Sequence, residues 1–280
     1  MIIKFYGTRG SIPVCHPEFQ EFGGNTTCVQ VGIKETNNIA VLDAGTGIRD
    51  LGKDLLTAGH KQNEIFILFT HFHWDHIQGF PFFAPAFVRD QKINILAMGK
   101  GRRIKSLREI FRIQMQKEYF PIGLDKMGAK FNFMLLNETH KVFEPNLKDP
   151  IPTILTANTH CHPGGAYGYR IERDGKILVF CTDIEHGEII NPKVVSLSKG
   201  ADLLIHDGQY TSEELKRKRG WGHSSFYQAI EVAERANVKM LVITHHDPDH
   251  DDEFLIRMER QCQDRFKDCV LAKEKMEIEL

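Results

Sequence analysis

The stretch Thr70-His71-Phe72-His73-Trp74-Asp75-His76 places three histidines and an aspartate within six consecutive positions. In an extended loop alternate side chains point the same way, so His71, His73 and Asp75 are expected to converge. His76 turns towards them where the next helix begins. Four ligand-type side chains exceed what one ion needs, and the crowding therefore predicts two metal ions side by side. A polar loop whose histidines only form hydrogen bonds is the alternative, and it accounts less well for such crowding.

Apolar runs elsewhere in the chain also end in residues of the types that bind metals. They lie where loops follow strands or begin helices: His160-Cys161-His162, Cys181-Thr182-Asp183, His206-Asp207, Gly222-His223-Ser224 and His245-His246-Asp247. Functional residues concentrate in such loops. An aspartate at position 183 would bridge two cations and neutralise both. Each segment by itself is more typical of structural polar residues, but together with the 70–76 loop they predict one shared cluster.

The hydrophobic pattern alternates between strands and helices along the whole chain. It predicts strands at Ile2–Tyr6, Cys28–Ile33, Ile39–Leu42, Glu64–Thr70, Ile93–Ala97, Phe131–Leu135, Ile151–Ala157, Tyr167–Ile171, Ile177–Cys181, Leu203–His206, Met240–Thr244 and, as an edge strand, 276–280. It predicts helices at Ile48–Ala58, within the basic segment Lys100–Lys117, at Phe226–Ala236 and at Asp252–Phe266. The expected organisation is a single domain over residues 1–280, built as an α/β sandwich with its site at strand ends.

Composition and charge exclude several classes of protein. With 41% hydrophobic and 26% charged residues, the chain is typical of globular proteins. Its 36 basic and 37 acidic residues leave a net charge of -1, so the whole chain lacks the electrostatic footprint of a protein that binds long nucleic acid. The absence of a secretory leader and of a membrane-length apolar run predicts a soluble cytoplasmic protein without membrane contact. The six cysteines form no C-x-x-C pair, and we expect them to be reduced.

The 70–76 loop resembles the signature of the metallo-β-lactamase superfamily. The resemblance extends to Gly7-Thr8-Arg9-Gly10-Ser11-Ile12-Pro13, Gly23-Gly24-Asn25-Thr26-Thr27-Cys28, Leu42-Asp43-Ala44-Gly45-Thr46-Gly47, Gly168-Tyr169-Arg170-Ile171 and Thr244-His245-His246-Asp247-Pro248. That superfamily has a four-layer αββα sandwich, which becomes the expected fold. The pattern is similar to its phosphodiesterase branch, which includes ribonuclease Z, the endonuclease that processes tRNA 3′ ends, and the cyclic-nucleotide phosphodiesterases. The resemblance therefore implies a metal-dependent hydrolase of phosphodiester bonds.

The resemblance also implies a set of ligands arranged around two divalent metal ions. One ion is expected among His71, His73 and His162, the other among Asp75, His76 and His245, with Asp183 bridging them. Nitrogen and oxygen ligands favour zinc, with manganese and iron as alternatives.

Two positions in this set have a neighbouring histidine that competes for the role. His162 is preferred to His160 because it precedes Gly168 by six residues, as in the endonuclease. His245 is preferred to His246 because it directly follows the apolar strand. Both choices rest on the resemblance.

The implied chemistry is hydrolysis by a hydroxide that the two metals make from water near neutral pH. Asp75 is expected to orient this nucleophile. His223 is similar in placement to the endonuclease's catalytic histidine and would protonate the leaving oxygen, while Asp207 orients it through the other ring nitrogen. The alternative for His223 is a residue that only hydrogen-bonds backbone groups where a helix begins.

The sequence constrains the substrate less than it constrains the metals. Phe80 and Phe82 are expected to stack on a base and Asn25 to contact substrate, although aromatic residues near apolar strands more often belong to the core. The basic segment 100–117 is either a solvated helix face or a grip for phosphates.

Three functional hypotheses follow from these residues. The leading one is a small phosphodiester substrate, above all a cyclic nucleotide. The second is the processing of RNA 3′ ends, and the third is a metal-binding protein without turnover. The third is disfavoured because all seven expected ligands are present. The resemblance further implies a homodimer.

Overall fold

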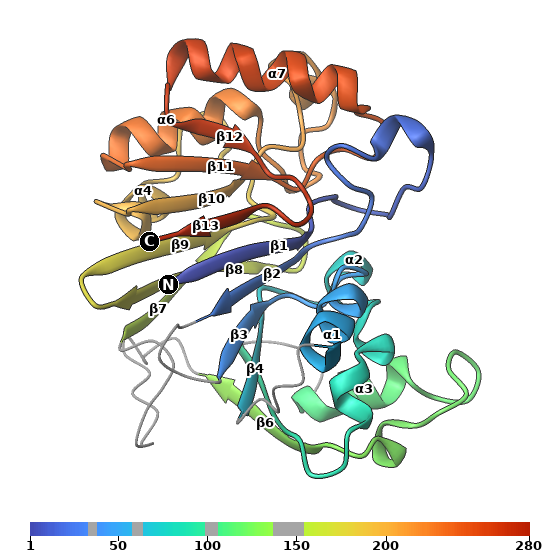
Figure 1. Cartoon of the computed structure of the whole chain (residues 1–280). Coiled ribbons are helices and arrows are strands. Elements are labelled where there is room, and N and C mark those ends of the chain that lie inside the picture. The colour runs from blue at the N-terminus through green and yellow to red at the C-terminus, as the bar shows by residue number, and fades with distance from the viewer. Residues whose placement is uncertain (33–37, 58–63, 99–105, 137–153) are drawn as a thin grey trace.

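The computed structural model describes residues 1–32, 38–57, 64–98, 106–136 and 154–280, with the backbone alone for residues 154–160. Within these ranges the strands form two sheets (Figure 1). The first sheet has the order β13 (Glu277–Glu279), β1 (Ile2–Gly7), β2 (Cys28–Gly32), β3 (Ile39–Leu42), β4 (Glu64–Phe69), β5 (Lys92–Met98) and β6 (Lys130–Leu136). The second has the order β12 (Cys269–Leu271), β11 (Met240–Thr244), β10 (Leu203–Asp207), β9 (Lys176–Cys181), β8 (Ala166–Arg173) and β7 (Ile154–His160).

Helices cover the outer face of each sheet. The first sheet carries α1 (Ile48–Thr57), α2 (Trp74–Ile77) and α3 (Leu107–Gln114), with short 3-10 turns at Pro17–Phe19, Phe80–Phe82, Ala84–Phe87 and Leu124–Lys126. The second carries α4 (Pro192–Ser198), α6 (Phe226–Ala236) and α7 (Asp252–Arg265), and the short α5 (Ser212–Arg217) precedes α6 in the chain (Figure 1).

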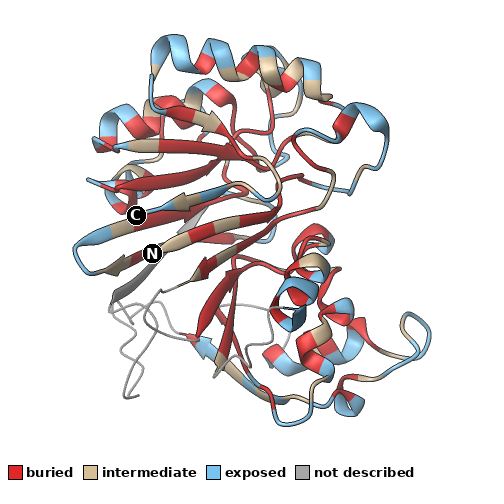
Figure 2. Ribbon diagram, viewed as in Figure 1, coloured by how far each residue is buried: buried red, intermediate tan, exposed pale blue. Residues whose placement is uncertain are grey.

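Alternating side chains along the strands produce the layers. In β4, Ile65, Ile67 and Phe69 pack towards α1 and α3. Phe66 and Leu68 of the same strand face the second sheet. Successive side chains of a strand point to opposite faces, so both sides of β4 are buried. Figure 2 shows buried residues concentrated along the strands and on the helix faces that meet them.

Among the described residues, three apolar cores separate the layers. In β10, Leu203 and Ile205 fill the core between the sheets, whereas Leu204 fills the core beneath α4, α6 and α7. The expected four-layer αββα sandwich is therefore confirmed.

Parallel strands bring distant parts of the chain to one edge of the sandwich. β3, β4 and β5 run parallel in the first sheet, as do β9, β10, β11 and β12 in the second. Their carboxyl ends lead into Asp43, His71, Asp183, Asp207 and His245. Ligands of open α/β sheets bind outside the carboxyl ends of the strands, so this edge is the expected place for a site.

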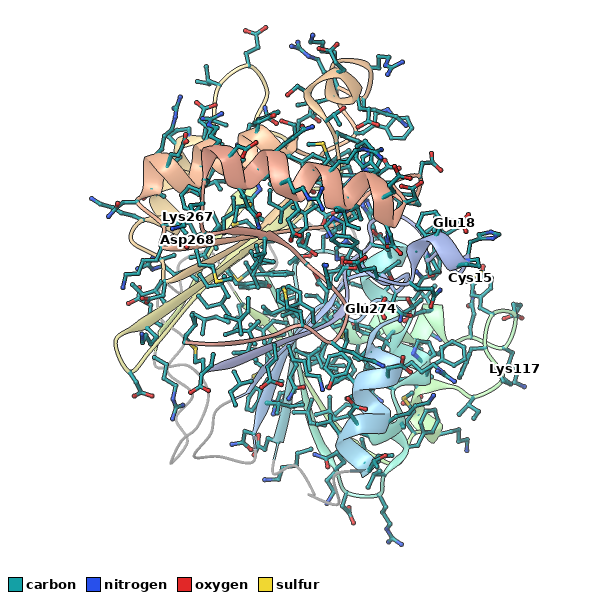
Figure 3. All side chains as sticks on the ribbon, turned by 45° about the horizontal axis from the view of Figure 1, so that its top comes forward. Cys15, Glu18, Lys117, Lys267, Asp268 and Glu274 are labelled. Carbon is teal, nitrogen blue, oxygen red and sulfur yellow. The ribbon has the colours of Figure 1, made fainter. Side chains whose placement is uncertain are left out.

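Long-range hydrogen bonds hold this edge together. Tyr169 Oη of β8 donates to the Phe69 carbonyl oxygen of β4 at 2.6 Å and thereby joins the two sheets. Asn25 donates to Glu274 from its backbone nitrogen at 2.6 Å and from Nδ2 at 3.0 Å, which ties the amino-terminal segment to the tail that leads to β13. Glu274 is labelled in Figure 3. The structure thus gives Asn25 a structural role, and its expected contact with substrate stays a prediction.

The predicted elements agree with the observed ones at most positions. β3, α6 and β11 have the predicted bounds, and most others differ by one or two residues at an end. The basic segment forms a helix over Leu107–Gln114 alone, capped by the side chain of Ser106, while its residues 100–105 lie outside the described ranges. α4, α5 and β12 escape prediction because they have seven, six and three residues, too few for a periodic pattern. None of the described helices is long and apolar enough to cross a membrane.

Candidate metal centre

The loop between β4 and α2 presents its histidines at one edge of the sandwich. His73 precedes α2 with an extended backbone, and Asp75 and His76 lie in that helix. His71, His73 and His162 offer ring nitrogens that all lie within 4.8 Å of one another. His162 Nε2 lies 2.9 Å from His73 Nδ1, so rings carried by the two different sheets converge. We call these three residues the first group.

Asp75, His76, Asp183 and His245 form a second group, which is buried and whose ligand atoms also lie within 4.8 Å of one another. His76 Nε2 lies 3.1 Å from Asp183 Oδ2 and 3.3 Å from Asp75 Oδ2. His245 Nε2 lies 3.2 Å from Asp75 Oδ2. The other oxygen of Asp183, Oδ1, lies 3.7 Å from His71 Nε2, so this carboxylate stands between the two groups.

Hydrogen bonds behind the cluster fix which nitrogen of His71 faces it. Asp43 accepts from Thr70 Oγ1 and from Thr70 N, both at 2.8 Å. Because the Thr70 hydroxyl donates its proton to Asp43, its oxygen accepts from His71 Nδ1 at 3.0 Å. The proton of His71 is therefore on Nδ1, and Nε2 presents a lone pair to the cluster.

The same reasoning orients three further rings, each of which donates from Nδ1 to an oxygen outside the cluster. These contacts are His76 to Asp43 at 2.8 Å, His162 to the Gly222 carbonyl at 2.9 Å and His245 to Gln209 Oε1 at 3.2 Å. Each ring then turns Nε2 inward. Metal-binding histidines are held in this way, with the second nitrogen donating to a carboxylate or a carbonyl.

Two observations show that these groups fit a pair of cations. His71 Nε2 and Asp183 Oδ2 are buried and make no hydrogen bond of suitable geometry, which a bound cation would remedy. His76 Nε2 and His245 Nε2 face each other at 3.3 Å, and both Nδ1 atoms already donate elsewhere. The contact is favourable only with a single proton or a single cation between the two nitrogens. Imidazole and carboxylate donors suit divalent transition metals.

The buried carboxylates of the cluster are stabilised in their charged form by neighbouring positive charge. Burial opposes ionisation of Asp183, but His245, His76 and His71 outweigh it and hold the pKa of Asp183 well below its usual range. Burial likewise lowers the pKa of His245, yet Asp183 and Asp75 raise it to about 9. Protons and metal cations therefore compete for the same lone pairs in this cluster.

Backbone strain is concentrated at the strand ends that carry the cluster. Asp43, Asp183 and His245 have φ values of 60°, 58° and 64°, in the left-handed region that residues other than glycine rarely adopt. Such strain persists only where the surroundings impose it, and it gathers at functional sites. Gly10 packs so closely that a Cβ there would lie 2.3 Å from His245 Nδ1, so the position requires glycine.

His223 and Asp207 form a buried pair at the rim of the cluster. His223 Nδ1 donates to Asp207 Oδ2 at 2.9 Å, which leaves Nε2 free to exchange a proton. Asp207 also accepts from Asp183 N at 3.0 Å and from Ser224 N at 2.9 Å. His223 has a ligand atom within 4.8 Å of those of His162 and Asp183, so it lies next to both groups.

The two histidines that compete with predicted ligands have different outcomes. His246 lies outside the cluster, because its Nε2 donates to the Ala272 carbonyl at 2.9 Å. The side chain of His160 lies outside the described residues.

The aromatic residues expected to bind substrate differ in exposure. Phe80 is fully buried and packs on Phe111 of α3 with ring centroids 4.5 Å apart. The expectation that Phe80 contacts substrate is therefore wrong, because this side chain belongs to the core. Phe82 is 56% exposed and meets the ring of Phe120 edge-on, so it remains accessible.

Sequence reasoning gave no role to three residues that support the cluster: Asp43, Thr70 and Gln209. Asp43 follows the buried strand β3, and an acidic side chain at the end of such a strand is the signal that points to it. Gln209 follows Asp207 by two residues and carries no comparable signal.

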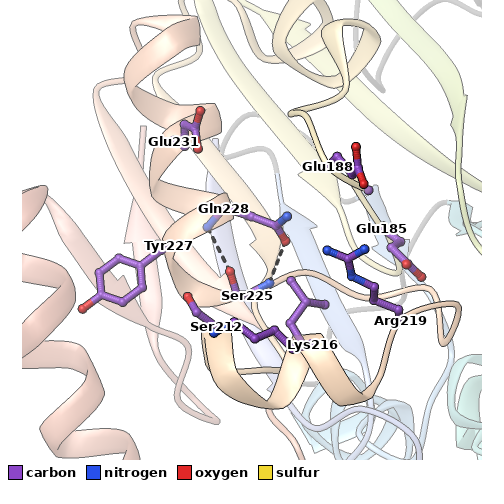
Figure 4. A pocket seen from close by; sticks show the side chains of 11 residues that line it. Glu185, Glu188, Ser212, Lys216, Arg219, Ser225, Tyr227, Gln228 and Glu231 are labelled. Atoms are coloured by element: carbon purple, nitrogen blue, oxygen red, sulfur yellow. Dashed lines mark hydrogen bonds between the residues drawn. The ribbon is translucent and has the colours of Figure 1, made fainter.

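A separate pocket of about 530 Å³ lies beside α5, α6 and the 185–188 loop (Figure 4). Glu185 and Arg219 are among its lining residues, which include no member of the two groups. The Glu185 carboxylate accepts from Gly220 N and Gly222 N at 2.9 Å each. This contact links the pocket to the loop whose Gly222 carbonyl holds His162.

Known proteins match this chain over most of its length and share its fold. Residues 38–246 match the family model described as the β-lactamase superfamily domain. Ribonuclease Z of Prochlorococcus marinus (strain MIT 9515) is 24% identical, and the match covers 98% of this chain and 98% of that protein. The metallo-β-lactamase fold protein YhfI from Bacillus subtilis has a TM-score of 0.71 at 17% identity, covering 99% of this chain and 98% of its own. The short form of human tRNase Z has a TM-score of 0.67 at 20% identity, covering 100% and 99%.

We expect Asp43→Asn to weaken zinc binding by about 10- to 100-fold, the usual effect of losing a residue that orients a metal ligand. Thr70 N and His76 Nδ1 donate to different oxygens of Asp43, and an asparagine side chain keeps only one acceptor oxygen, so it loses one of these two hydrogen bonds. Titration of zinc against a chromophoric chelator measures the affinity. Asp50→Asn, which alters an exposed carboxylate of α1, is the matched control. Equal zinc affinity in both variants would contradict the role of Asp43.

Proposed function

We propose that this chain, which belongs to the metallo-β-lactamase superfamily, is a metal-dependent phosphodiesterase. The observation that carries the proposal is the convergence of the first and second groups at one edge of the two sheets. Nitrogen and oxygen donors around a shared carboxylate suit a pair of divalent cations, which can hold both the attacking and the leaving oxygen of a phosphodiester. The relative named ribonuclease Z supports a phosphodiester bond as the target.

Zinc is the metal we propose, with manganese and iron as alternatives. The first group consists of imidazoles, which suit zinc well. The second group adds the carboxylates of Asp75 and Asp183, harder ligands that manganese also accepts.

The chain's own residues have distinct parts in the proposed reaction. Cations bound here would supply hydroxide from water near neutral pH. Asp75 Oδ2 is fixed by a hydrogen bond from Ser11 N at 2.8 Å and is placed to orient the attacking water. His223, held by Asp207, is placed to give the leaving oxygen a proton from Nε2.

We propose a small nucleotide as the substrate, above all a cyclic one. In α3, the basic side chains are already paired, Arg108 with Asp125 and Arg112 with Glu109. These pairs leave little free positive charge on α3 for a long phosphate backbone. α3 therefore suits a substrate that contacts few phosphates better than a long nucleic acid.

The processing of RNA 3′ ends is the second candidate. It is favoured by the relative named ribonuclease Z and by the likeness to human tRNase Z, both matched over almost their whole length. The basic run 216–219, which precedes Trp221 and His223, would suit an RNA backbone as well as a single phosphate.

The proposal predicts that phosphodiester cleavage requires a metal. Protein loaded with zinc or manganese should hydrolyse bis(p-nitrophenyl) phosphate and at least one of cyclic AMP and cyclic GMP. EDTA should abolish the activity and added metal should restore it, as measured by absorbance and chromatography. A gel assay with precursor tRNA tests the second candidate in parallel. A folded, metal-loaded sample that cleaves none of these substrates would overturn the proposed function.

We expect His223→Ala to lower kcat by about 100-fold or more without changing metal content. The loss should be smaller with p-nitrophenolate as the leaving group than with a nucleotide alkoxide, because p-nitrophenolate needs no proton near neutral pH. Steady-state kinetics with both substrates measure this difference. His16→Ala removes an exposed histidine outside both groups and should leave kcat unchanged. Equal losses with the two leaving groups would contradict proton donation by His223.

A further inference from the structure

The chain contains two tryptophans: Trp74 directly follows His73, and Trp221 precedes His223 by two residues. In the first group His73 is exposed and His162 half-buried, whereas the second group is buried, so substrate must approach from the first group. Trp74 directly follows His73 and is 63% exposed. Trp221 precedes Gly222, whose carbonyl accepts from His162, and is 58% exposed. Both indole side chains are therefore open to solvent close to residues of the metal centre.

Trp221 sits on a loop whose conformation is fixed by hydrogen bonds. Trp221 N donates to the Lys218 carbonyl at 3.1 Å. Gly220 N and Gly222 N both donate to the Glu185 carboxylate. The two glycines have φ values of 83° and 91°, which lets the chain turn on either side of Trp221. The loop from Lys218 to Trp221 therefore has a fixed backbone conformation, which holds the indole ring in place without a ligand.

Lys218 is a cation without an acidic partner in this loop. Its Nζ lies 4.1 Å from the ring centroid of Trp221 and 5.9 Å from that of Tyr210. No carboxylate of the described residues pairs with it, whereas Lys216 pairs with Glu213 at 2.6 Å. The ring of Tyr210 in turn meets His223 edge-on with centroids 5.8 Å apart. The unpaired ammonium thus contacts the exposed indole, and Tyr210 connects it to His223, the residue placed to protonate the leaving group.

An aromatic ring can stack on a nucleobase that is not base-paired, and a cation beside the ring that has no acidic partner can bind the phosphate of the same nucleotide. Lys218 Nζ lies over the Trp221 ring, and the residue is still 58% exposed, so ring surface remains available for stacking. We propose that Trp221 and Lys218, with Trp74 next to His73, form a platform that binds a nucleobase beside the scissile phosphodiester. A base within a duplex is already stacked on its neighbours, so the platform selects nucleotides or single-stranded ends. The inference rests on the proposed phosphodiesterase function and specifies its substrate class.

Tryptophan emission tests the platform without any turnover. Trp221→Phe leaves Trp74 as the sole indole, and Trp74→Phe leaves Trp221. Thymidine 5′-monophosphate added to the zinc-loaded variants should change each emission saturably, and methyl phosphate, which has no base, should not. The platform is overturned if neither emission responds to the nucleotide, or if methyl phosphate has the same effect. If the emission per tryptophan changes with protein concentration but not with added nucleotide, a second copy of the chain covers the indoles. That result would also overturn the platform.

Substrate preference gives a second, kinetic readout. The p-nitrophenyl ester of thymidine 5′-phosphate and methyl p-nitrophenyl phosphate share a leaving group and differ in the nucleoside. The preference for the nucleoside ester, as a ratio of kcat/KM, should fall about tenfold or more in Trp221→Ala. It should fall less in Trp221→Phe, which keeps an aromatic ring. An unchanged preference in Trp221→Ala would overturn the platform.

Tyr227→Ala is the matched control for these variants. Tyr227 is an exposed aromatic residue of α6, and its side chain points away from Arg219 in Figure 4. The substitution should leave the preference between the two esters unchanged. A fall equal to that of Trp221→Ala would show a nonspecific effect and overturn the assignment.

Failure of the platform and failure of the phosphodiesterase function are distinguishable. If the unaltered protein cleaves neither ester, the proposed function fails, while the emission experiment still decides whether a nucleobase binds. A single-stranded oligoribonucleotide used as a competitor identifies the source of the base. Tighter binding of the oligonucleotide than of thymidine 5′-monophosphate supports an RNA end, and the reverse order supports a free nucleotide.

Discussion

The charge of Asp183 is the constraint on which the centre depends. This carboxylate is 1% exposed and stands between two groups of imidazoles contributed by both sheets. A buried negative charge is costly unless positive charge lies next to it, and the ring nitrogens around it present lone pairs that cannot face one another unaided. Divalent cations satisfy both needs at once, because they neutralise the carboxylate and occupy the space between the lone pairs. The hydrolytic chemistry proposed for the chain follows from the same positive charge.

The fold delivers this arrangement by ending parallel strands of both sheets at one edge. Each sheet contributes a buried aspartate behind the ligands. Asp43, after β3, holds His76 directly and His71 through Thr70. Asp207, at the end of β10, holds His223 and the backbone of Asp183. These two carboxylates fix the orientation of the histidine rings. Part of the hydrogen bonding in the folded state therefore serves to orient the metal ligands.

The sequence predicted the layers and most strands because their signals are local. Continuous or alternating apolar residues mark β4 and β10, and the 70–76 loop holds four of the proposed ligands in one stretch. The preference for His245 over His246 rests on the resemblance. The structure places His245 in the cluster through a left-handed backbone conformation that no local sequence pattern reveals. The burial of Phe80 does not follow from the sequence, because an aromatic residue after a functional loop gives the same local pattern whether it faces solvent or the core. The supporting role of Gln209 depends on a long-range contact with His245, and local patterns do not report such contacts.

The central claim is that the two groups bind two cations next to Asp183, and anomalous diffraction tests it most directly. Crystals of the protein grown with zinc would be measured on both sides of the zinc absorption edge. The account predicts two anomalous peaks, one among His71, His73 and His162 and the other among Asp75, His76 and His245. Zinc peaks elsewhere on the chain, with none between these side chains, would contradict it.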